Sequence, residues 1–123
     1  MKAGALLQKV QNHDSAALSA WEIFSMATEQ GAACINMQDQ IGTIEVGKKA
    51  DIIALDLNKP NTTPCYDPIA SLVYSGNSEN VAMVMVDGNI IYDQGSFTRV
   101  DEADILHRAQ QKAEKIYQHS LQS

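Results

Sequence analysis

The sequence of 123 residues has little of what marks secreted or membrane-spanning proteins. It holds only two cysteines, Cys34 and Cys65, which are too few for a disulfide scaffold, and we expect both to be buried structural thiols. No N-terminal apolar stretch resembles a signal peptide, and no run approaches the roughly 20 apolar residues of a membrane span. These absences predict one soluble domain in the reducing cytoplasm, with no membrane partner.

Positive charge is also scarce. Nine Lys and Arg stand against fifteen Asp and Glu, which gives a formal net charge of −6. Binding to nucleic acid needs clustered Lys and Arg to neutralise phosphates, and the nearest approach to a cluster is the pair Lys48-Lys49. We therefore exclude nucleic acid as a partner. The composition, 45% hydrophobic and 20% charged, is that of an ordinary globular domain.

Residues that could carry catalysis are few and scattered. The three histidines, His13, His107 and His119, include no pair at the H-x-H or H-x-x-x-H spacing of metal ligands. The two cysteines add no ligand set, and no G-x-S-x-G frame for a nucleophile occurs. We therefore assign no catalytic, cofactor-binding or metal-binding residue to this chain.

Helices are expected in residues 1–40. Apolar positions recur loosely over Met1–Val10, and Ser19-Ala20-Trp21-Glu22 matches a capping box at the start of a stronger helix. Gly31 is placed to end that helix, and residues 32–35 could add a turn. The apolar stripe predicted to be buried consists of Trp21, Phe24 and Ala27, with Ile23 and Met26 beside it.

The middle of the chain changes to strand patterns. Residues 43–46 form a short alternating segment between two glycines, and Asp51–Leu57 is an apolar run typical of a buried strand. All three prolines fall in the expected loop 58–68, and residues 70–74 fit a helix or a strand equally well. Val81–Val86, Asp87-Gly88 and Asn89–Tyr92 predict a β-hairpin with a type I′ turn.

The last segment predicts a helix over residues 101–121. Asp101 is its expected N-cap, and Glu102 and Asp104 in the first turn suit the helix dipole. The expected fold class is therefore α+β, with N-terminal helices, a small and mostly antiparallel sheet, and a C-terminal helix. We expect residues 1–40 and residues 41–123 to form two portions of one compact unit.

Gly42 to Lys49 comes within one residue of the phosphate-binding pattern G-x-x-x-x-G-K-[ST]. That site needs a hydroxyl residue after the lysine and a helix whose N-terminus faces the phosphate. Here Lys49 replaces the hydroxyl residue and a strand follows. We therefore interpret Gly42 to Lys49 as a loop with two glycines that leads into a strand.

The segment Ile41–Ile53, with the sequence IGTIEVGKKADII, closely resembles the G-[ST]-[IL]-E-x-G-K-x-A-D-[LI] motif of metal-dependent amidohydrolases. Ala27–Ala33 resembles the helix end that precedes this motif. Further similarity at Pro64–Pro68, Leu72–Tyr74 and Val84–Gly88 points to the branch with chlorohydrolases and S-adenosylhomocysteine/methylthioadenosine deaminases. The resemblance covers nearly the whole chain.

This resemblance implies a C-terminal portion of a hydrolase that acts on C–N or C–halogen bonds. In that family a (β/α)₈ barrel holds zinc or iron, and the metal activates water. The ligand positions would all lie upstream of Met1, so the chain is expected to hold no cofactor and to be inactive alone. Residues 1–40 would be the last barrel helices, and residues 41–123 a partial β-sandwich with the terminal helix.

The resemblance implies that the rest of the barrel and of the sandwich would cover apolar faces of this chain. Without those parts, we expect the faces to be covered by partners. We expect a homo-oligomer formed through these faces, or assembly with a separately encoded barrel chain. Two alternatives to a silent hydrolase piece therefore stay open. One is a stand-alone binding or interaction module that is oligomeric, and the other is one chain of a split hydrolase.

Overall fold

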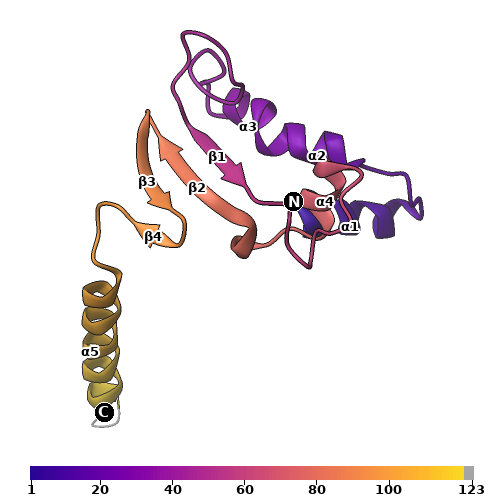
Figure 1. Cartoon of the computed structure of the whole chain (residues 1–123). Coiled ribbons are helices and arrows are strands. Elements are labelled where there is room, and N and C mark those ends of the chain that lie inside the picture. Colours follow the sequence, from indigo (N-terminus) through magenta and orange to yellow (C-terminus); the bar gives the residue numbers. More distant parts are fainter. Residues whose placement is uncertain (121–123) are drawn as a thin grey trace.

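The computed structural model describes residues 1–120. Helices and an antiparallel sheet occur together, so the predicted α+β class is confirmed (Figure 1). The elements are, in order, α1 (Lys2–Asn12), α2 (Ala20–Ala27), α3 (Glu29–Cys34), β1 (Ile52–Leu55), α4 (Pro68–Tyr74), the 3-10 turn η1 (Ser78–Asn80), β2 (Val81–Val86), β3 (Asn89–Asp93), β4 (Ser96–Phe97) and α5 (Glu102–Ser120).

The sheet is antiparallel throughout, in the order β1-β2-β3-β4. β2 and β3 form the predicted hairpin, and its turn residues Asp87 and Gly88 both have positive φ, 49° and 77°. A type I′ turn requires this geometry at both central positions, so the prediction is confirmed. β1 pairs with the outer side of β2, with Ile53 opposite Val84.

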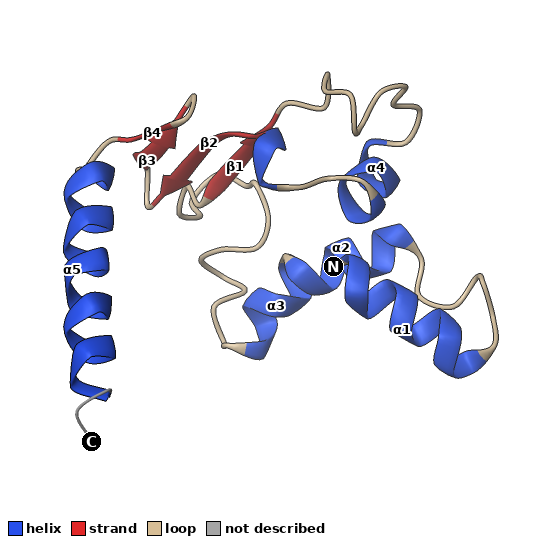
Figure 2. Ribbon diagram, turned by 90° about the horizontal axis from the view of Figure 1, so that it is seen from below, coloured by secondary structure: helices blue, strands red, loops and turns tan. Residues whose placement is uncertain are grey.

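A small core holds α1, α2 and α4 together beside the sheet (Figure 2). Its buried members are Ala5 of α1, Ile23 of α2 and Val73 of α4. The segment that could have been helix or strand is the helix α4. Asp67 caps it by accepting a hydrogen bond from the Ala70 amide (3.0 Å), and Pro68 occupies its first turn, where a missing N–H costs nothing.

The capping box of α2 is confirmed. The Ser19 hydroxyl accepts from the Glu22 amide (3.3 Å), and the Glu22 carboxylate accepts from the Ser19 amide (2.7 Å). The predicted end at Gly31 is wrong, because α2 stops at Ala27 and Gly31 lies inside α3. Thr28 causes the break: its backbone leaves the helical region, and its hydroxyl donates to the Phe24 carbonyl (2.9 Å).

The predicted buried stripe of α2 is shifted. Trp21 is 63% exposed and Met26 48%, whereas Ile23 is buried. Phe24 is half-buried and its ring lies 5.9 Å from that of Trp21. The face carrying Ile23 is buried because α1 and α4 pack on it, and the face carrying Trp21 has no such neighbour.

Two further expectations are wrong. Cys34 and Cys65 are exposed rather than buried, since one ends the short helix α3 and the other lies in the proline-rich loop. Residues 43–46 do not form a strand, and Ile44 and Val46 are fully or almost fully exposed. Their alternating pattern has no strand to pair with, so the chain forms turns there instead.

The helix α5 lies apart from the rest, beyond β4, in both views (Figures 1 and 2). Its N-cap is as predicted, with Asp101 accepting from the Asp104 amide (3.1 Å). None of its residues is buried. Leu121, the expected last residue of this helix, lies outside the described residues. Among residues 1–120, no helix is long and apolar enough to cross a membrane.

Candidate functional site

The glycine-rich motif from Ile41 onward joins the helices to the sheet. Gly42 has a φ of 95° and lies against α3; a Cβ built on it would come within 2.7 Å of the Ala32 Cβ and 3.0 Å of the Glu29 Cα. Only glycine combines this backbone conformation with so close an approach. Gly47 has a similar φ of 96°, but no atom lies within 4 Å of its built Cβ.

The lysine of this motif, Lys48, interacts with other residues of the same loop. The Lys48 ammonium donates to the Thr43 hydroxyl (2.5 Å) and lies 3.7 Å from the Glu45 carboxylate. The Glu45 carboxylate also interacts with the Thr43 side chain. This hydrogen bond and the charge of Lys48 hold the pKa of Glu45 below its usual value. No helix follows Gly47, so the structure supports the rejection of a phosphate-binding loop.

The Ala-Asp pair at the end of the motif fixes the hairpin turn. The Asp51 carboxylate accepts from the Asp87 amide (2.7 Å), and the Ala50 carbonyl accepts from the Gly88 amide (3.1 Å). These two bonds tie the start of β1 to the turn between β2 and β3. The motif that carries the family resemblance therefore has a structural task at each of these positions.

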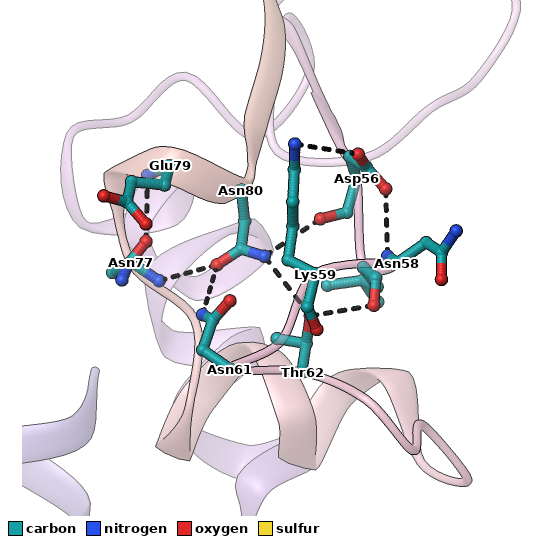
Figure 3. A network of polar contacts seen from close by, with 9 residues as sticks. Asp56, Asn58, Lys59, Asn61, Thr62, Asn77, Glu79 and Asn80 are labelled. Atoms are coloured by element: carbon teal, nitrogen blue, oxygen red, sulfur yellow. Dashed lines mark hydrogen bonds and ion pairs between the residues drawn. The ribbon is translucent and has the colours of Figure 1, made fainter.

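A buried polar network lies at the other end of β1, where the segment after β1 meets the turn before β2 (Figure 3). Asn80 is fully buried at its centre. Its amide nitrogen donates to the Asp56 carbonyl (2.9 Å) and the Thr62 hydroxyl (3.3 Å). Its amide oxygen accepts from the Asn61 side chain (2.8 Å) and the Asn77 amide (3.0 Å).

This arrangement uses both donors and both acceptor positions of the Asn80 amide. A side chain with all its hydrogen bonds made inside the protein has none left for a ligand. At the rim, the Asp56 carboxylate accepts from the Asn58 amide (2.9 Å) and lies 3.3 Å from the Lys59 ammonium. These interactions, the Asn58 bond first, lower the pKa of Asp56. The network is a structural joint.

Sequence analysis missed this joint. A usable signal was present, because Asn77 and Asn80 are spaced as a capping pair directly before an apolar strand. The partners Asp56, Asn61 and Thr62 lie 18 to 24 residues away in the chain, and only the fold brings them to Asn80.

A second polar cluster ties α2 to α3. The buried Ser25 hydroxyl donates to the Glu29 carboxylate (2.5 Å) and accepts from the Gln30 side chain (3.0 Å). A serine beside a carboxylate could suggest a nucleophile with a base. However, Ser25 is only 5% exposed and its hydroxyl is bonded to both Glu29 and Gln30, so the cluster bridges the helix break at Thr28.

The structure does not bring the three histidines together. His13 ends α1 in a left-handed conformation (φ 51°), while His107 and His119 lie on α5. His107 contacts Gln111 through its Nε2 atom (2.9 Å). Among residues 1–120, no group of three His, Cys, Asp or Glu side chains could hold a metal ion. The residues present therefore do not fit the zinc or iron of the resembled family.

Comparison with known proteins agrees with the resemblance. A model of the amidohydrolase family matches residues 1–91, and the chain belongs to this family. It is 38% identical, over 116 residues, to the 5-methylthioadenosine/S-adenosylhomocysteine deaminase of Desulforudis audaxviator. That match covers 94% of this chain and 27% of the deaminase. The chain thus spans about a quarter of the length of the curated relatives it matches.

Solved structures show the same likeness. A zinc-bound adenosine deaminase from Xanthomonas campestris superposes with a TM-score of 0.91 at 31% identity, covering 95% of this chain and 27% of that one. The atrazine chlorohydrolase of Arthrobacter aurescens, complexed with zinc, gives a TM-score of 0.69 at 29% identity, covering 75% and 20%. Both deaminases and chlorohydrolases are therefore among the proteins this chain is similar to.

Proposed function

We propose that this chain is the structural C-terminal portion of a hydrolase that acts on C–N or C–halogen bonds, and that it is inactive alone. The proposal rests on two observations taken together. It is similar over nearly its whole length to metal-bound hydrolases, and residues 1–120 offer no side-chain group suited to a metal. In this proposal residues 1–40 are the last barrel helices, and residues 41–123 are the sandwich-like portion.

The chemistry of the whole enzyme would then come from residues outside this chain. A bound zinc or iron lowers the pKa of a water molecule and supplies the nucleophile. The contribution of this chain is structural: Asn80 bonds to the segment after β1, Gly42 packs the motif loop against α3, and Asp51 ties the start of β1 to the β2–β3 turn.

An activity assay tests the proposal directly. The purified chain is incubated with Zn²⁺ or Fe²⁺ and with S-adenosylhomocysteine, 5-methylthioadenosine, adenosine or a chlorotriazine. We expect no ammonia or chloride release above the protein-free rate, while circular dichroism shows a folded protein. Metal-dependent turnover that chelation abolishes would overturn the proposal.

A split hydrolase is the first alternative, and the exposed face of α2 favours it. Trp21 is 63% exposed and its ring lies 5.9 Å from that of Phe24, so these two aromatic side chains form an apolar surface that a partner could use. A separately encoded barrel chain with an H-x-H motif would cover them. Co-expression with such a chain, if the reading frame immediately upstream encodes one, should give a stable complex with activity, and Trp21→Glu should weaken it.

A stand-alone oligomeric module in the cytoplasm is the second alternative. The free, exposed thiols of Cys34 and Cys65 suit a reducing compartment, and the exposed apolar faces suit self-association. A thermal-shift screen with nucleosides and related small molecules separates this module from a silent piece. A specific stabiliser would favour the module, and its absence would favour the structural role.

A further inference from the structure

We draw no further inference here: the strongest candidate, the apolar face of α5 around Leu106 and Ile116, is exposed in the described residues 1–120, and nothing in the structure shows what covers it.

Discussion

The helices α2 and α5 make an instructive pair, because both carry an apolar stripe and a helix cap, and only one is packed. α2 is eight residues long and buries Ile23 against α1 and α4. α5 is more than twice as long and buries nothing among the described residues. Amphipathic spacing thus shows that a face is suited to burial, but the neighbour that buries it must come from elsewhere. The predictions below test how different these two regions are.

The largest effect is expected at the joint of the packed region. Asn80→Ala removes four hydrogen bonds, to the Thr62 hydroxyl, the Asn61 side chain and two backbone groups, the Asp56 carbonyl and the Asn77 amide. We expect a loss of about 4 kcal/mol in the free energy of unfolding, measured by urea denaturation. The control Asn58→Ala changes an exposed asparagine that contributes only its backbone N–H, and it should cost little. Equal effects would show that Asn80 is not the centre of the joint.

The next substitutions compare the two helices directly. Ile23→Ala creates a cavity between α1, α2 and α4 and should cost about 3 kcal/mol. Ile116→Ala removes the same atoms from α5, where the side chain is 71% exposed. At protein concentrations below self-association it should leave the denaturation midpoint within error. A loss from Ile116→Ala similar to that from Ile23→Ala would show that α5 is packed against the body.

Gly42 and Gly47 have nearly the same φ, 95° and 96°, but only Gly42 is closely packed. Substituting each of them by alanine therefore measures backbone strain and close packing separately. Gly47→Ala should cost about 1–2 kcal/mol, because an alanine there must adopt a positive φ. Gly42→Ala carries the same strain and also a 2.7 Å contact with the Ala32 Cβ, so it should cost about 2 kcal/mol more. Thermal or urea unfolding of both variants gives the difference. No difference would mean that α3 and the motif loop are not in close contact.

The smallest effect concerns pH and the cap of α2. Hydrogen bonds with Ser19 hold the pKa of Glu22 below its usual value. The carboxylate therefore stabilises the fold above the pKa of the unfolded chain, near 4.5, and this contribution disappears as the pH falls through the lowered pKa. Glu22→Gln should be less stable than the wild type at pH 7, and the two should converge once the pH has fallen below the lowered pKa of Glu22. A gap that persists in acid would assign the effect to something other than the charge.

Much of the local structure could be predicted because local rules decide it. The Asp87-Gly88 turn, the Ser19–Glu22 capping box and the Asp101 cap each depend on residues within a few positions of one another. The family also followed from a local run of residues, Ile41–Ile53. The choice of helix for residues 68–74 depends on Asp67 and Pro68, which are equally local, and these signals were overlooked.

The errors have a common physical origin. The exposure of Trp21, Cys34 and Cys65, and the turns at residues 43–46, depend on which segments lie nearby in space. Hydrophobic spacing cannot supply this information, because an apolar side chain is buried only where another element arrives to cover it. The Asn80 network could not be predicted for the same reason, because its partners Asp56, Asn61 and Thr62 are distant in the sequence.

The sequence by itself determined the family, the caps, the hairpin turn and the amphipathic character of each helix, since these depend on residue types at short range. Only the tertiary structure decided that Ile23 rather than Trp21 is buried and that Asn80 joins helices to sheet. The same structure left the apolar face of α5 uncovered. Packing partners are set by contacts between segments far apart in the chain, and no local pattern specifies which of them will meet.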